Sequence, residues 1–200
     1  KEKIYNEHWY NALEIEMAKS AVSIQKARLE AIKYLSEAQN NLTGKFPKAK
    51  LLLVDPDQAI ITDEEEAIQV LKDSRPSDMI MGRTSVGPHK SDLQAIYEDK
   101  LTLAKDCSTG EQKAILISII LANAKSLAKI SNVSPIVLLD EVSAHLDKER
   151  QAALYDEICG LGVQAWMTGT GPELFSELKN KAQFIEVSTI DGISELSISN

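Results

Sequence analysis

A short apolar run, Ile136 to Leu139, is followed directly by Asp140 and Glu141, and it restricts the possible folds of this chain more than any other stretch. A continuous apolar run of this length is typical of a strand buried on both faces of a parallel sheet. Helical patterns lie on both sides of it, over 110–130 and 147–161. Strands that alternate with helices indicate an α/β fold with a mostly parallel sheet.

The remaining segments extend this alternation. After Gly162 the pattern predicts a strand, a short helix, a second strand and a hairpin strand after the Asp191-Gly192 turn, at 163–168, 172–179, 182–188 and 193–199. Earlier in the chain it predicts a strand over 51–61 interrupted at Pro56, a helix capped by Thr62 or Asp63 and closed by Arg75-Pro76, and strands at 81–86, 93–97 and 101–105.

The first 42 residues contain no Gly and no Pro, and small or apolar residues recur there at alternating steps of three and four. This stripe predicts an amphipathic helix, which at 1.5 Å per residue would be roughly 60 Å long. Gly44 and Pro47 supply the stop signals. A rod of this length is either an ordinary packed helix or an arm that serves as a partner surface. We therefore expect a helical arm or second lobe over 1–78 and an α/β part over 79–200.

Composition narrows the class of protein. The net charge is -8, and the chain after Asp140 is rich in acids, so that part should not attract a phosphate backbone. Cys107 and Cys159 show no metal-ligand spacing and fit reduced thiols in a cytoplasm. The first 30 residues are charged throughout and the apolar run 115–122 is short, so we expect no signal peptide and no membrane span. The chain begins without Met, and we expect it to be part of a longer protein.

The Asp140-Glu141 pair is the first candidate for chemistry. A parallel strand delivers such carboxylates to the carboxyl edge of the sheet, where these folds bind ligands. One carboxylate can hold Mg²⁺ through its water shell, and the next can orient or deprotonate a water for attack on a phosphoryl group. The alternative is a solvated or helix-capping pair at a strand end.

A polar step, Ser108-Thr109-Gly110-Glu111-Gln112, opens the most apolar helix of the chain. A hydroxyl and the free N–H groups of a helix N-terminus form an anion site, and glycine lets a phosphate approach the backbone closely. The alternative is a plain N-cap supported by Glu111 or Gln112.

In this order and spacing the two pieces resemble the signature motif and the Walker B strand of an ABC-type ATPase head, followed by its D-loop. Val86 to Leu93, VGPHKSDL, resembles a segment of the RecF recombination-mediator family, as do PIVLLDEVSAHLD and VQAWMTGT farther on. The resemblance is clear over about 79–180. It implies that the chain is the C-terminal half of a P-loop NTPase-like head related to Rad50 and SMC proteins, with a long helical arm.

The resemblance also implies a function. RecF-type proteins are bacterial, cytoplasmic and DNA-binding; they bind ATP with Mg²⁺ and act in DNA repair, recombination, replication and the SOS response. Their partners are single-stranded and gapped duplex DNA, RecR- and RecO-type mediators, and a second copy of the protein in an ATP-dependent homodimer. Two heads hold ATP between them. Full-length members are weak DNA-dependent ATPases.

Site residues follow from the resemblance by position. The signature motif, which in the family reaches the γ-phosphate of ATP bound to the other head, would comprise Ser108, Thr109, Gly110, Glu111 and Gln112. By the same resemblance, Asp140 would bind Mg²⁺ through water, and Glu141 would be the catalytic residue that activates the attacking water. Ser143 and Asp147 would belong to the D-loop, and Thr168 or Thr170 would be the switch residue. Many ABC heads have His at the switch, and the charge of Glu111 is unfavourable near a phosphate unless it faces away.

The sequence contains no phosphate-binding G-x-x-x-x-G-K-[ST] loop, which in the family lies in the part before this segment. We therefore expect the chain alone to bind no ATP measurably and DNA only weakly. Two alternatives remain: a non-enzymatic helical interaction module on an ATPase-like scaffold, and the C-terminal half of an SMC or Rad50 head. The intact set of signature and carboxylate residues disfavours the first, and an arm of only about forty residues disfavours the second.

Overall fold

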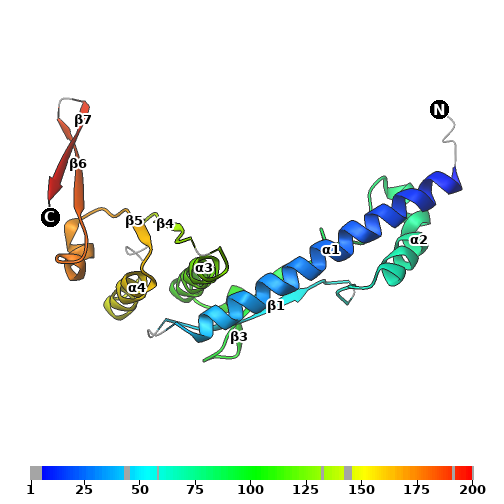
Figure 1. Ribbon diagram of the computed structural model, residues 1–200, viewed down its shortest axis with the longest axis horizontal. Helices are drawn as coiled ribbons and strands as arrows, with labels where there is room; N and C mark the ends of the chain where they lie inside the picture. The colour runs from blue at the N-terminus through cyan, green and yellow to red at the C-terminus, as the bar shows by residue number, and fades with distance from the viewer. Residues whose placement is uncertain are drawn as a thin grey trace.

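The fold is taken from a computed structural model, which describes residues 6–42, 46–57, 59–131, 133–141, 146–190 and 192–199. The molecule is elongated: α2 and the start of α1 lie at one end, α1 runs from there to the middle, and the β6–β7 hairpin lies at the other end (Figure 1). Helix α3 lies in the middle, and its apolar side chains contribute to two of the three cores.

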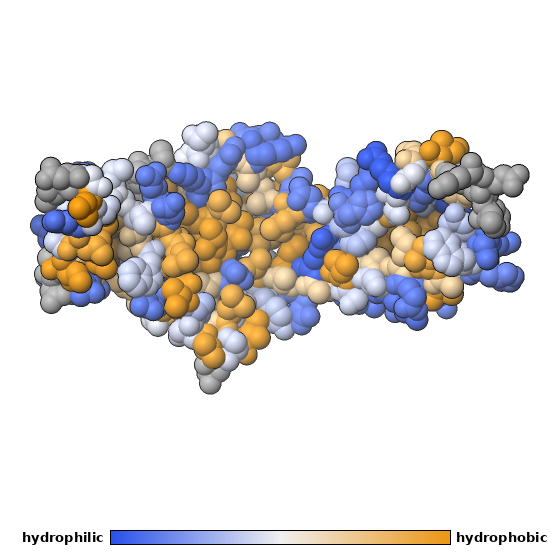
Figure 2. All heavy atoms as spheres, turned by 90° about the horizontal axis from the view of Figure 1, so that it is seen from above, coloured by the Kyte–Doolittle hydropathy of each residue, from blue (hydrophilic) through white to orange (hydrophobic). Residues whose placement is uncertain are grey.

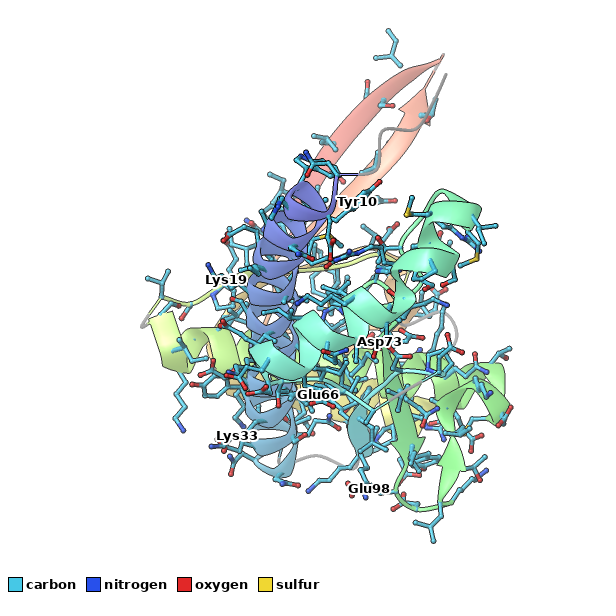
Figure 3. The ribbon with its side chains drawn as sticks, turned by 90° about the vertical axis from the view of Figure 1, so that its right-hand side faces the viewer. Tyr10, Lys19, Lys33, Glu66, Asp73 and Glu98 are labelled. Carbon is cyan, nitrogen blue, oxygen red and sulfur yellow. The ribbon has the colours of Figure 1, made fainter. Side chains whose placement is uncertain are left out.

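The predicted long helix is α1, Glu7–Asn40. Asn6 caps it, and its side-chain oxygen accepts a hydrogen bond from Trp9 N at 3.1 Å. Ala18 and Val22 of α1 are buried against Ala67 and Leu71 of α2. Figure 3 shows α2 lying across α1 at this end. The expected stop at Gly44 lies outside the described residues.

Helix α2, Glu64–Met81, begins as predicted but does not end where the sequence indicates. Asp63 caps it by accepting from Glu66 N at 3.0 Å. The predicted end at Arg75-Pro76 is wrong, because the helix continues through Pro76 to Met81 and stops at Gly82, whose φ is +69°. The strand expected at 81–86 is therefore the end of α2 and a loop. Arg75 forms an ion pair with Glu14 of α1. This contact holds the segment in the helix, although Pro76 has no N–H to donate to the helical hydrogen bonds.

Three strands form an antiparallel sheet beside α1: β1 (Ala49–Val54), β2 (Asp92–Tyr97) and β3 (Thr102–Leu103). The first strand ends before Pro56, and the third is shorter than predicted because the chain turns into a 3-10 helix, η1 (Ala104–Asp106). β1 pairs with β2 in the register Leu51 with Ala95. The sheet therefore pairs a strand that precedes residue 78 with strands that follow it. The division of the chain into 1–78 and 79–200 remains a proposal.

The α/β part agrees with the prediction. Helix α3 (Thr109–Ser131) precedes β4 (Ile136–Leu139), and α4 (Lys148–Leu161) leads into β5 (Gln164–Met167). β4 and β5 are parallel, with Val137 opposite Ala165. The 3-10 helix η3 (Pro172–Leu178) and an antiparallel hairpin, β6 (Phe184–Ile190) with β7 (Ile193–Ser199), follow. The expected α/β class with long helices is confirmed. The parallel sheet that was expected is represented among the described strands by the β4–β5 pair, while the other strand pairs are antiparallel.

Helix α3 is long and apolar enough to cross a bilayer by length and composition alone. The packing of α3 against other elements offers another reason for its apolar composition. Ala114, Ile117 and Leu121 are buried in the core shared with β4 and α4, and Ile115 is buried in the core shared with β1 and β2. Leu116, Ile120 and Leu127 of the same helix are 56%, 39% and 45% exposed, so α3 is a core helix on one side and has a second apolar side that the described residues leave exposed.

Candidate functional site

The carboxyl ends of β4 and β5 lie side by side because the two strands are parallel and in register, Leu139 opposite Met167. Thr168 N donates to Leu139 O at 3.0 Å and extends the pairing by one step. Asp140, directly after β4, is therefore adjacent to Thr168, directly after β5. Thr168 Oγ1 donates to Asp140 Oδ1 at 2.5 Å.

The same hydroxyl accepts a second hydrogen bond. Glu141 N donates to Thr168 Oγ1 at 2.9 Å. Glu141 has a φ of +46°, which is uncommon for a residue other than glycine. Thr168 therefore ties down both the carboxylate of Asp140 and the turned backbone of Glu141, whose side chain stays exposed.

These residues fit the Mg²⁺ and water chemistry expected of them. Asp140 uses Oδ1 for Thr168, while Oδ2 forms no hydrogen bond or ion pair with any described residue. No cluster of three or more His, Cys, Asp or Glu side chains suited to a metal lies within the described residues. Mg²⁺ commonly takes only one or two carboxylates and keeps several waters, so a single exposed Asp140 matches its needs.

The signature step forms a second group, at the N-terminus of α3. Ser108 Oγ donates to Glu111 Oε2 at 2.8 Å, and Ser108 N donates to the same oxygen at 3.1 Å. Lys100 Nζ lies 2.5 Å from Glu111 Oε1. These contacts lower the pKa of the Glu111 carboxyl to about 2, the Lys100 hydrogen bond first and the Ser108 bonds second. The carboxylate is neutralised by Lys100 but lies on Ser108, as in the capping-box contact that the plain N-cap alternative predicts. The expected conflict with a phosphate at Ser108 therefore remains in this conformation.

Gln112 also turns inward. Its Nε2 donates to Lys105 O and Cys107 O, both at 3.0 Å, and so holds η1 against the first turn of α3. Thr109 remains exposed, and Gly110 lies beside Arg150 of α4. Three of these five residues, Ser108, Glu111 and Gln112, therefore make structural contacts that shape the step.

Two site residues were missed from the sequence. Lys100, in the β2–β3 turn, neutralises Glu111, and no local pattern points to it. Arg150 carries its guanidinium to Asp147, with Nη1 at 3.3 Å from Oδ2, and a Cβ at Gly110 would lie 4.0 Å from the same nitrogen. The spacing of Asp147 and Arg150 could have indicated their pair, since residues three apart on a helix end are neighbours.

Comparison with known proteins places these groups in context. No family model matches the chain. Proteins named "DNA replication and repair protein RecF" match it from Mesorhizobium japonicum, 40% identical over 190 residues, and from Brucella abortus, 41% over 191 residues. These matches cover 91% and 92% of this chain. The chain belongs to the RecF family.

The chain spans about half the length of these relatives, 50% in both cases. The structure titled "recombination mediator protein RecF-ATP in RecFOR pathway" superposes with a TM-score of 0.74 over 98% of this chain and 52% of that one, at 19% identity. An SMC head, titled as bound to the C-winged helix domain of ScpA, gives a TM-score of 0.51 at 20% identity over 85% of this chain and 42% of that one. These likenesses show a shared fold of the RecF and SMC head type.

The site residues of this RecF-family chain form two separate groups. Asp140, Glu141 and Thr168 meet at the strand ends, while Ser108 and Glu111 meet at α3. No hydrogen bond or ion pair joins the two groups within the described ranges. Asp147 caps α4, where its Oδ1 accepts from Arg150 N at 2.9 Å. Ser143 lies outside the described residues, and Thr170 is exposed without a side-chain hydrogen bond to a described residue.

Proposed function

We propose that the chain is part of a RecF-type, ATP-dependent DNA-binding protein that acts in recombinational repair and in the processing of replication gaps. In this proposal it contributes two different half-sites: the carboxylates Asp140 and Glu141 for ATP bound to its own head, and the signature step for ATP bound to a second head. The observation that carries the proposal is the double hydrogen bond of Thr168 to Asp140 and Glu141 at the ends of a parallel strand pair.

At the first half-site, Mg²⁺ would supply the charge that neutralises the ATP phosphates. Asp140 would hold the ion through water, with its carboxylate aimed by the Thr168 hydroxyl. Glu141 would orient and deprotonate the attacking water, and its exposed carboxylate projects from a backbone that Thr168 fixes. Thr168 is the better candidate for the switch position than Thr170, because it alone of the two contacts both carboxylate residues.

At the second half-site, the N-terminus of α3 would face the γ-phosphate held by the partner head. The free N–H groups of the first turn and the helix dipole favour a phosphate there. Lys100 offsets the charge of Glu111, but the Glu111 carboxylate also accepts from Ser108 N and Oγ. It would therefore have to leave Ser108 when a phosphate binds there. Burial of Ala114, Ile115 and Ile117 in the first turns holds this N-terminus in place.

The partners follow from membership of the family. We include in the proposal single-stranded and gapped DNA, mediators of the RecR and RecO type, an ATP-dependent homodimer, a role in the SOS response and a cytoplasmic location in a bacterium. The names of the similar proteins, which mention DNA replication and repair and the RecFOR pathway, support the DNA and mediator partners.

The proposal is tested by two substitutions in the full-length protein that contains this chain. Ser108→Arg should leave ATP binding by each monomer nearly unchanged and abolish ATP-induced dimers, because a bulky side chain blocks the approach of the second head. Glu141→Gln should allow dimers and slow hydrolysis, so that the dimers persist. Sedimentation with and without ATP and Mg²⁺ measures both. Ser77→Arg, an equal charge change on α2, is the matched control. Wild-type dimerisation by Ser108→Arg would show that the step is only an N-cap.

A further inference from the structure

The loop after α2 is strongly basic although the chain is acidic. Residues 82–91, GRTSVGPHKS, contain Arg83, His89 and Lys90 and no Asp or Glu, whereas the whole chain carries a net charge of -8. The three basic side chains line one cleft of about 670 Å³, together with Met81, Thr84 and Ser85. We call this the basic cleft. Cations and hydroxyls without a lining carboxylate suit an anionic ligand, in particular a phosphate.

The loop that carries the cleft is fixed to α1. Arg28 Nη1 donates to Pro88 O at 2.5 Å and to Ser91 Oγ at 2.7 Å. Ser91 Oγ in turn donates to Gln25 Oε1 at 3.2 Å. Gly87 adopts a φ of +132°, which favours glycine, and a Cβ there would lie 3.3 Å from the His89 ring. The basic side chains therefore project from a preformed loop, so little ordering is needed when a ligand binds.

Two acids lie near the cleft. Asp78 Oδ1 accepts from the N–H of Ser85, a lining residue, at 2.8 Å, and Asp57 pairs with Lys90. Lys90 Nζ is 2.9 Å from Asp57 Oδ2, and both side chains are substantially exposed, 38% and 63%. An exposed pair of this kind contributes little to stability and is readily exchanged. A phosphate can therefore replace Asp57 as the partner of Lys90, and Asp57 should weaken phosphate binding.

An apolar cavity adjoins the basic cleft. It has a volume of about 420 Å³, lies between α1, α2 and the loop, and shares Thr84 and His89 with the cleft. Apolar side chains dominate its lining, among them Met17, Ile24, Ile61, Val70, Leu71 and Val86. The volume falls in the range of about 300–1,000 Å³ that is usual for small ligands. Pro88 and His89 at its rim offer ring surfaces against which a planar group can stack.

We propose that this composite site binds single-stranded nucleic acid, with a backbone phosphate in the basic cleft and an unpaired base in the apolar cavity. Each nucleotide of such a strand carries a phosphate close to a planar, largely apolar base. The basic cleft and the apolar cavity are adjacent in the same way, because both are lined by Thr84 and His89. In a duplex the bases are stacked and paired, so they cannot enter the cavity while the backbone lies in the cleft. This inference rests on the proposed DNA-binding function and locates one contact for it.

The test measures binding of the full-length protein to a fluorescein-labelled oligothymidine by anisotropy, over a series of salt concentrations. Arg83→Gln and Lys90→Gln should each weaken binding several-fold and reduce the slope of log K against log salt by about 0.7. Asp57→Asn should strengthen binding, because it frees Lys90. Lys72→Gln, which removes the same charge from an exposed position on α2, is the matched control and should change neither quantity.

The base pocket is tested separately. Ala21→Phe, which fills the cavity, and Ile24→Asn, which makes it polar without adding a charge, should weaken oligothymidine binding and leave binding of an abasic oligomer unchanged. If an abasic strand or a duplex loses affinity by the same factor, the base does not enter the cavity and the proposal is wrong. The proposal is also wrong if Arg83→Gln and Lys90→Gln bind oligothymidine with the same affinity and the same salt dependence as Lys72→Gln. ATP-driven dimerisation should remain intact in all these variants, so that failure here is distinct from failure of the ATP site.

Discussion

Thr168 and Asp140 are joined by a short hydrogen bond, 2.5 Å from Thr168 Oγ1 to Asp140 Oδ1, between residues that follow two parallel strands. The bond has a chemical consequence. On the proposed assignment of Thr168 to the switch, this chain has a hydroxyl that does not titrate near neutral pH in place of a histidine, which does. In this chain the position serves to orient a carboxylate and a backbone N–H, and any sensing of the γ-phosphate would depend on geometry.

The first prediction concerns this hydroxyl. Thr168→Val keeps the side-chain shape but removes the donor to Asp140 and leaves Glu141 N unpaired. Loss of a partner that orients a metal-binding carboxylate typically costs about 10- to 100-fold in activity. We expect a fall of that size in ATP hydrolysis by the full-length protein, measured as steady-state phosphate release. Thr170→Val should lower the rate by less. The reverse ranking would assign the switch to Thr170.

A second prediction concerns acid. The pKa of Glu111 is lowered to about 2 by Lys100 and Ser108, from an ordinary value near 4.5. A lowered folded-state pKa means that the contacts of the carboxylate stabilise the fold above about pH 4.5 and lose this effect as the pH falls toward 2. Glu111→Gln should therefore be less stable than wild type at pH 7, and the difference should shrink between pH 4.5 and 2. Urea unfolding across that range measures it. Glu98→Gln, on the neighbouring turn, is the control; a difference independent of pH would contradict the assignment.

A third prediction concerns the junction of α1 and α2. Arg75 donates to both oxygens of Glu14, from Nε at 2.6 Å and from Nη2 at 2.5 Å, and the side chains are only 12% and 7% exposed. Nη2 also donates to Asn11 Oδ1 at 2.6 Å, and the guanidinium lies over the Tyr10 ring. Arg75→Met leaves Glu14 buried without this partner, which should cost about 3–5 kcal/mol.

The double variant Glu14→Leu/Arg75→Met separates the two causes of that loss. It removes the uncompensated charge, so it should be more stable than Arg75→Met alone. Hydrogen exchange of α2 amides gives the local readout. Equal protection in the single and double variants would show that packing of the Arg75 stem, and not its charge, holds the helices together.

The structure separates what the sequence predicts from what it does not. The cap at Asp63, the helix that starts after Asp147, the strand before Asp140 and the break at Gly162 follow local rules, and the sequence predicts them at or near their positions. The failure at Pro76 has a long-range cause, since Arg75 is held by a residue 61 positions earlier. The orientation of Glu111 depends on Lys100, and that of Asp140 on Thr168, 28 positions away. Periodicity reports neither kind of contact.

The face of the β4–β5 pair that points away from α4 is bare. Val137 and Leu139 are buried, whereas Ile136 and Leu138, which alternate with them, are 61% and 73% exposed, and Trp166 is 52% exposed. Figure 2 shows apolar side chains gathered over the middle of the molecule. Parallel sheets are normally covered on both faces. Because the chain spans about half of its relatives, we infer that other parts of the full-length protein cover this face.

The last prediction follows from that face. The isolated chain should self-associate, because exposed apolar sheet surface and the unpaired edge of β4 favour contact with a second copy. Leu138→Lys with Trp166→Lys should lower the mass found by light scattering at high concentration toward that of a monomer. Ile80→Lys, at an 88% exposed position on α2, adds one charge away from the sheet; it is the control for the single variant Leu138→Lys and should leave the association unchanged. A wild-type chain that stays monomeric at every concentration would contradict the prediction. If Ile80→Lys lowers the mass as much as the substitutions on the sheet do, the association depends on net charge and not on the exposed sheet face.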